Sequence, residues 1–261
     1  MDEVVGEMTQ RFDRLAAGCS DLAPFAFMYR QVSEEVRASV RAKRYDSPAY
    51  VAHLDSVFAT LYFRAIDEWR LGHRDRVPRA WRIAFSAAQS HRVTALGDLL
   101  LGMNAHISRD LPYSLAAVGL LLPDGRDAVP DVLAVNKDIA RSQGPALAGV
   151  AHLFDPRVRD LDQLERAVGS QKIGQLKLGN VGDPRQIGKV IAAWRLEAVE
   201  NARLLLAAKT HEERVRVDTE IDANATLRAL LIADATAYPA PKRDAESRLR
   251  YCLAQRSHSG G

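Results

Sequence analysis

The stretch LLLGMNAHISRDLP, residues 99–112, decides how this chain folds, because it places an amide, an imidazole and a carboxylate in an otherwise apolar helical run. At the spacing of an α-helix, His106 and Asp110 share one face with Leu99 and Met103. We expect that face to be buried. Burying a polar group without a partner costs roughly 2–7 kcal/mol. The imidazole and the carboxylate must therefore meet each other, a metal ion, a ligand or further polar side chains.

Helical segments with clear start and stop signals extend on both sides of this run. Ser47 and Pro48 are typical of a helix N-terminus, an apolar stripe from Leu54 to Trp69 follows, and Gly72 is suited to end the helix. Further helices are expected to begin near Pro78, at Val129, and at Asp183 with Pro184. We find no alternating strand pattern and no internal repeat. The sequence predicts an all-α fold, a single-domain multi-helix bundle.

Composition limits the range of functions. The chain has 261 residues, of which 47% are hydrophobic, and no shift in composition divides it. We expect one domain over residues 1–254 and a flexible tail over residues 255–261. The 36 basic and 33 acidic residues are well mixed, so nucleic-acid binding is not expected. Without a Rossmann or phosphate-loop pattern, a nucleotide cofactor is not expected either.

The two cysteines, Cys19 and Cys252, lie near opposite ends of the sequence and lack CxxC spacing. This pattern predicts neither a disulfide framework nor a structural zinc site, and it favours a reducing compartment. Residues 1–7 are acidic and do not resemble a signal peptide, and no uncharged apolar window reaches the length of about 18 residues that a membrane span requires. We therefore expect a cytoplasmic protein without a membrane span.

The chemistry is expected to centre on His106, Asp110 and Asn104. Side chains four residues apart on a helix can bind one divalent metal ion together, so His106 and Asp110 are candidate metal ligands as well as catalytic residues. Without a metal, Asp110 would orient the imidazole, fix its tautomer and raise its basicity. Asn104 would orient a substrate or ligand. The structural alternative is a buried hydrogen-bonded pair, in which Asp110 accepts from the imidazole and Asn104 satisfies a helix terminus or a loop carbonyl group.

Substrate contacts are expected from neighbouring helices. The candidates are Asp55, Arg64, Asn136 and Trp194. Asp55 could also complete a metal site. Arg64 and Arg195 lie beside apolar stripes, from which a guanidinium could reach inward to an anionic substrate. Trp194 lies on an apolar stripe, where core packing is the alternative to a ligand platform.

Several segments together resemble the bacterial domain-of-unknown-function family 5995. They are LDSVFA at 54–59, YFRAID at 62–67, PRAW at 78–81 and LGMNAHISRDL at 101–111, with weaker similarity at 131–136 and 193–195. The similarity spans about residues 45–210 and is most specific around Asn104. The family has a second asparagine where this chain has Ser108, which places any role of Ser108 in doubt. The resemblance implies a helical, cytoplasmic protein of actinobacterial type and supplies no activity.

Two classes of function follow from these observations. The first is an enzyme acting on a small, partly apolar molecule, in a pocket between the helix of Asp55 and the helix of His106. Its reaction would be metal-assisted or acid–base hydrolysis, elimination or cyclisation, as in bacterial secondary metabolism, which would make it a hydrolase, lyase or cyclase. The second is a non-catalytic ligand-binding or interaction module in which His106 and Asp110 only stabilise the fold.

Overall fold

The computed structural model describes residues 1–159, 184–238 and 243–258. Regular structure in these ranges is helical, and the only β features there are two isolated bridges, Val93–Ala237 and Leu121–Asp127. The prediction of an all-α multi-helix fold is confirmed. The predicted helix start at Asp183 lies outside the described residues, and α9 is described from Pro184 onward.

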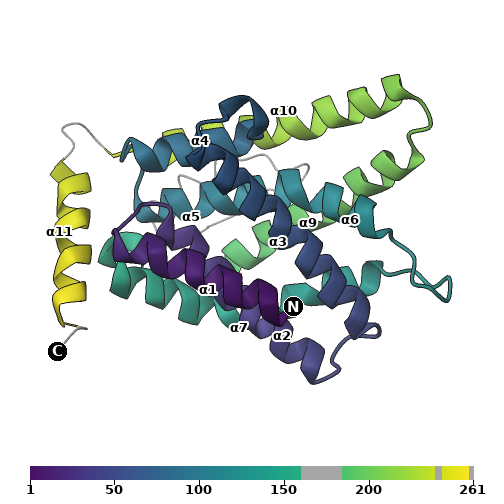
Figure 1. Cartoon of the computed structure of the whole chain (residues 1–261), viewed down its shortest axis with the longest axis horizontal. Coiled ribbons are helices and arrows are strands. Elements are labelled where there is room, and N and C mark those ends of the chain that lie inside the picture. Colours follow the sequence, from purple (N-terminus) through teal and green to yellow (C-terminus); the bar gives the residue numbers. More distant parts are fainter. Residues whose placement is uncertain (160–183, 239–242, 259–261) are drawn as a thin grey trace.

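The helices follow one another along the chain in this order: α1 (Asp2–Ala17), α2 (Ala23–Arg41), α3 (Pro48–Arg70), η1 (Arg74–Arg76), α4 (Arg79–Gln89), α5 (Ala95–Asn104), η2 (Ala105–Asp110), α6 (Leu111–Val118), α7 (Val129–Leu153), η3 (Pro156–Arg159), α9 (Pro184–Ala207), α10 (His211–Ala235) and α11 (Arg243–His258). The run of α5, η2 and α6 forms the centre of the bundle, with α2, α4 and α10 against α5, and α3, α9 and α10 against η2. The apolar side chains of this run, among them Leu99, Leu101 and Leu111, are almost fully buried. Figure 1 shows α11 at one side of this bundle.

Helix α3 follows its sequence signals closely. It begins at Pro48, and Gly72, which adopts the left-handed conformation at φ +83°, lies just beyond its end. The backbone N–H groups of Asp46 and Ser47 donate to the carboxylate of Asp131 on α7, at 2.8 and 2.7 Å. The first N–H groups of a helix lack partners within it. A carboxylate from α7 therefore satisfies donors at this end and ties α3 to α7.

The central run changes pitch at its midpoint. Residues Ala105–Asp110 form a π-helix, after which α6 begins with Pro112 in its first turn. Proline has no backbone N–H, and its ring clashes with the carbonyl group four residues earlier in an α-helix. The wide turn accommodates Pro112, so the helical path continues to Val118. Single π turns inside α-helices occur frequently at functional sites.

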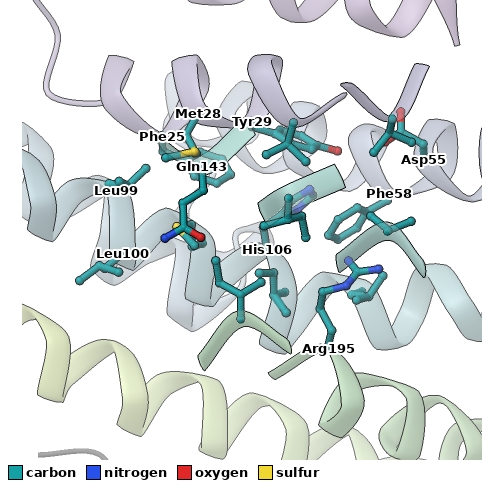
Figure 2. A pocket seen from close by; sticks show the side chains of 18 of the residues that line it. Phe25, Met28, Tyr29, Asp55, Phe58, Leu99, Leu100, His106, Gln143 and Arg195 are labelled. Carbon is teal, nitrogen blue, oxygen red and sulfur yellow. The ribbon is translucent and has the colours of Figure 1, made fainter. Parts of the chain in front are cut away.

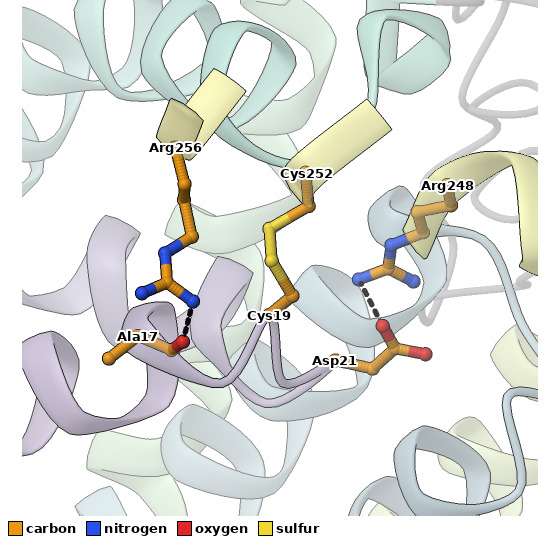
Figure 3. Close-up of a disulfide and its surroundings, with 6 residues drawn as sticks. All are labelled: Ala17, Cys19, Asp21, Arg248, Cys252 and Arg256. Atoms are coloured by element: carbon orange, nitrogen blue, oxygen red, sulfur yellow. Dashed lines mark hydrogen bonds and ion pairs between the residues drawn. A yellow bond between two sulfur atoms is a disulfide. The ribbon is translucent and has the colours of Figure 1, made fainter. Parts of the chain in front are cut away.

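The two cysteines form a disulfide, contrary to the sequence-based expectation. Cys19 lies between α1 and α2, Cys252 lies on α11, and Figure 3 shows the bond between them. The expectation was wrong because local spacing carries no information about residues that are 233 positions apart and meet only in the fold. Since disulfides persist mainly in oxidising compartments, the argument for a reducing compartment loses its basis.

Helix α11 is also held by polar contacts beside the disulfide. Arg248 pairs with Asp21, and Arg256 donates to the carbonyl group of Ala17, as Figure 3 shows. The helix runs to His258, through the first part of the segment expected to be a flexible tail. Over the described ranges, no helix combines the length and the apolar character that crossing a membrane requires.

Candidate functional site

A cavity of about 90 Å³ lies beside the π-helix, between α2, α3, α5, α7 and α9. Its wall is mostly apolar. The polar side chains in it are Tyr29, Asp55, His106, Gln143 and Arg195. Figure 2 shows Tyr29, Asp55, His106 and Arg195 toward one end, with Phe58 among them, and Met28, Leu99, Leu100 and Gln143 toward the other. The titratable groups therefore gather at one end of the cavity, the polar end, and the other end is apolar apart from the amide of Gln143.

His106 is the polar group at the centre of the wall, and its side chain is almost completely buried. Its Nδ1 lies 3.2 Å from Oδ2 of Asp110, and the same oxygen accepts a hydrogen bond of 2.7 Å from the Trp81 indole N–H. Because the indole only donates and the carboxylate only accepts, we assign the imidazole proton to Nδ1. The lone pair is then on Nε2, which is buried without a hydrogen-bond partner.

Aromatic rings hold the imidazole of His106 in place. The ring of Phe58 stacks on it at a centroid distance of 3.5 Å and an angle of 6°, and Tyr29 approaches at 4.4 Å and 65°. Burial lowers the pKa of His106 below its ordinary value of 6.5, whereas the hydrogen bond to Asp110 acts in the opposite direction. His106 is therefore neutral at pH 7, in the form that accepts a proton at Nε2.

Asp55 supplies a second titratable group to the same cavity, as the sequence suggested. The residue is half-buried, but its Oδ2 is fully buried and has no hydrogen-bond partner. Burial raises the pKa of Asp55 to about 7, although the N-terminal ammonium of Met1, the Ser33 hydroxyl and Arg195 act in the opposite direction. At neutral pH this carboxyl group therefore exists in both protonation states.

Arg195 is the third polar group at this end. It is 4% exposed, and its Nη2 donates to the carbonyl group of Val132 at 2.6 Å. Its Nε is buried without a partner, and within the described part of the chain no carboxylate forms an ion pair with it. Burial lowers the pKa of Arg195 to about 10, with Tyr45 and Asp55 opposing. The guanidinium still carries its charge at pH 7.

The expected metal site does not match this geometry. The His106 Nδ1 and the Asp110 carboxylate face each other instead of a common third point, and Asp110 does not line the cavity. Across the described ranges, no group of three or more histidine, cysteine or acidic side chains is arranged to hold a metal ion. A divalent ion needs more ligands than the two side chains that remain, the His106 imidazole and the Asp55 carboxylate. The residues present do not fit a metal centre, and Asp110 acts on the site through His106.

Asn104 does not face the cavity, contrary to expectation. It is completely buried, and its Nδ2 donates to the carbonyl group of Ala225 on α10 at 2.9 Å. The neighbouring Ser108 accepts a 2.6 Å hydrogen bond from Arg228, which also pairs with Glu197. The face of the central helix that bears Asn104 and Ser108 thus joins α10 and α9, because the helical path directs these side chains away from His106.

Three of the four residues expected to contact substrate lie outside the cavity lining. Arg64 is exposed on α3, because it lies on the face opposite the apolar stripe. Asn136 is half-buried on α7, with its Oδ1 lacking a partner, and does not reach the cavity. Trp194 is 1% exposed and packs in the core under the Arg228 guanidinium. Asp55 alone among the four lines the cavity.

Sequence reasoning missed Tyr29, Phe58 and Gln143 as cavity residues. Tyr29 and Ser33 stand four residues apart on α2, and each has a buried oxygen without a partner among the described residues. Charged and amide residues lie between and after them in the sequence, so only the four-residue spacing of two hydroxyl groups could have indicated that they share a face. Phe58 and Gln143 carry no such signal, because an aromatic ring or an isolated amide on a helix is ordinary core or boundary composition.

Fold and site together define an all-helical protein with a largely apolar internal cavity, whose wall carries a histidine oriented by an aspartate. The chain belongs to a family of unknown function, DUF5995, whose model matches residues 1–235. The resemblance noted in the sequence is thereby confirmed, and the match extends beyond residues 45–210 on both sides. Comparisons with curated proteins and with solved structures yield no match. The cavity residues all lie within the matched range, whereas α11 lies beyond it.

Proposed function

We propose that this protein is an enzyme that performs acid–base chemistry on a small, mainly apolar molecule bound in the cavity. The observation that carries the proposal is the state of His106. Its Nδ1 is held by Asp110, its Nε2 is buried with no partner among the described residues, and its side chain is part of the cavity wall. A buried nitrogen without a partner is costly. A substrate proton or hydroxyl group at Nε2 would relieve that cost.

Asp110 serves as the positioning residue in this proposal. Its Oδ2 receives the Trp81 N–H and the His106 Nδ1–H, and the Arg109 guanidinium lies 3.6 Å from Oδ1. When Nε2 accepts a proton, the imidazole becomes a cation next to this carboxylate. Asp110 then stabilises the charge as it forms, and it fixes the tautomer before the reaction begins.

Asp55 is the proposed acid partner. Burial raises the pKa of Asp55 to about 7 and lowers the pKa of His106 below 6.5. At a pH above the lowered pKa of His106 and below that of Asp55, the histidine is mostly a neutral base and the aspartate is mostly a neutral acid. An elimination or a cyclisation needs this combination, because one group removes a proton while the other protonates a leaving group or a carbon atom. Hydrolysis would use the same base to activate a water molecule.

The test is turnover by His106→Gln in screens of short-chain esters and β-hydroxy acids, which report hydrolysis and elimination. We expect the variant to lose roughly 10²–10⁴-fold in kcat, the range typical of a positioned general base. His53→Gln is the matched control, because His53 is exposed on α3. Turnover by His106→Gln equal to that of the wild type, at an unchanged melting temperature, would contradict the proposal.

Non-catalytic ligand binding is the second candidate, and the apolar wall of the cavity favours it. A binding protein needs neither a fixed histidine tautomer nor a matched acid. A binding protein has no turnover, and Asp110→Asn should leave its ligand affinity unchanged. For the proposed enzyme, the same change should reduce kcat much more than it alters KM, because the tautomer of His106 is no longer fixed.

A further inference from the structure

Arg195 is a charged group at the polar end that the acid–base chemistry does not use. Its guanidinium is 4% exposed and, among the residues that the structure describes, it donates only to the Val132 carbonyl group, while its Nε has no partner there. A buried charge without a counter-ion costs several kcal/mol of stability. Proteins retain such a charge where something else compensates it, and a bound anion is the direct way to do so.

We propose that the ligand of the cavity is a small carboxylic acid with a short apolar body, whose carboxylate binds Arg195. This inference deepens the proposed function, on which it rests for the choice of the cavity as the ligand site. The carboxylate would occupy the end that bears Arg195, Asp55 and the Tyr29 hydroxyl group. The body would extend toward Met28, Leu99 and Leu100 (Figure 2).

The charges at this end favour a monoanion. Asp55 is the carboxyl group that acts on Arg195, and burial keeps a large part of it protonated at neutral pH because its pKa is about 7. A protonated Asp55 can donate a hydrogen bond to a ligand carboxylate, while Arg195 supplies the positive charge. A phosphate group would bring a second negative charge to a site with one guanidinium. The carboxylate is therefore the head group that fits.

The cavity volume limits the apolar body. About 90 Å³ is smaller than the engineered cavity of about 150 Å³ that binds benzene in another protein. An aliphatic chain of a few carbons matches this space, whereas a long fatty acid does not. Among straight-chain acids, affinity should therefore rise with length and then fall once the chain exceeds the cavity.

The experiment is calorimetric titration with hexanoate, hexan-1-ol and hexyl phosphate. We expect the wild type to bind hexanoate at least tenfold more tightly than either analogue, and Arg195→Met to lose that preference. Arg64→Met is the control, because Arg64 is exposed on the neighbouring α3. Equal binding of the acid and the alcohol, tighter binding of the phosphate, or a preference that survives Arg195→Met would each overturn the inference.

A second measurement uses the wild type alone and does not depend on the folding of the variant. In ¹⁵N NMR, hexanoate should shift the Nε–H resonance of Arg195, because this donor gains a carboxylate partner. A titration that leaves this resonance unmoved would overturn the inference even if hexanoate binds elsewhere.

The two proposals can fail separately. Hexanoate binding should survive His106→Gln to within a few-fold, since Nε2 is not needed to hold a carboxylate. If the preference for the acid over the alcohol depends on Arg195 while turnover is unchanged in His106→Gln, only the proposed chemistry is wrong. If turnover requires His106 while the acid has no advantage over the alcohol, only the ligand class is wrong.

Discussion

Two arginines are buried to the same extent in this protein, with opposite surroundings. Arg195 and Arg248 are each 4% exposed. Arg248 on α11 lies 2.6 Å from Asp98 and 3.2 Å from Asp21. Burial favours a lower pKa for Arg248, yet the two carboxylates outweigh it and raise the pKa above its ordinary value. Arg195 has no such pair, and burial lowers its pKa to about 10.

Burial alone does not show whether an arginine has a structural or a ligand-binding role, whereas the groups around it do. Where an arginine joins elements of the fold, as Arg248 joins α11 to α5 and to the start of α2, carboxylates surround it. Such a pair contributes specificity more than net stability, but removing one partner is costly. At the cavity, the described residues supply a charge with no carboxylate bonded to it, and Asp55, the carboxyl group that acts on it, is only partly ionised at neutral pH. The unpaired arginine is therefore the one expected to take its partner from solution.

The largest effect should come from breaking the paired arginine. Asp98→Asn removes the closer carboxylate of Arg248 and leaves a buried charge with Asp21 alone. We expect a loss of about 3–5 kcal/mol in the free energy of unfolding, measured by urea denaturation. The control is Asp222→Asn. This change removes a partly exposed carboxylate 3.5 Å from Arg79 and should alter the free energy of unfolding by less than about 1 kcal/mol. If the two variants lost the same free energy of unfolding, the ion pair between Asp98 and Arg248 would contribute no more than an exposed pair does.

A smaller change is expected when the unpaired arginine is replaced. Arg195→Met loses the hydrogen bond to Val132, worth about 0.5–1.5 kcal/mol, and gains by removing a charge from an apolar wall. The free energy of unfolding should stay within about 1.5 kcal/mol of the wild type. Destabilisation as large as that of Asp98→Asn would mean that Arg195 has a structural partner, and the comparison would fail.

The smallest effect concerns the influence of Arg195 on the protonation of Asp55, because Arg195 is the weakest of the groups that shift the pKa of Asp55. The pKa of Asp55 is raised from 3.8 to about 7 by burial, so the native state binds this proton more strongly than the unfolded chain. The contribution of Asp55 should therefore make the protein less stable as pH rises from about 4 to 7. In Arg195→Met the pKa of Asp55 should rise further, because the positive charge that lowers it is gone. ¹³C NMR of the Asp55 carboxyl carbon during a pH titration measures this pKa in the wild type and in the variant. A lower pKa in the variant would contradict the expected influence of Arg195 on Asp55.

Much of the helical framework could be predicted from local sequence, because caps and periodicity act over a few residues. The stripe and stop signal of α3 and the shared face of His106 and Asp110 are of this kind. The cavity could be predicted only in part. Asp55 was identified, and Arg195 was noted as an arginine that could reach inward, but nothing local indicated that these two residues share one cavity.

The errors arose where tertiary structure decides the outcome. The pairing of Cys19 with Cys252 depends on the two ends of the chain meeting across the bundle. Asn104 was predicted to face the site because of its sequence proximity to His106, but its amide bonds to α10 instead. The metal hypothesis required a third ligand from another helix, and which helices meet at a point is not encoded in any single periodic pattern.

The π-helix of Ala105–Asp110 has a consequence for chain length. A π turn contains one residue more than an α turn closed by the usual hydrogen bond. Deleting one residue, such as Ile107, would let the segment close as a regular α-helix, while the parts of the helix before and after it keep their faces in the bundle. The change would fall on the wide turn itself, because its side chains, that of His106 among them, would meet the cavity at another angle. A substitution leaves the wide turn in place, so a one-residue deletion tests the role of the π-helix more directly than a substitution does.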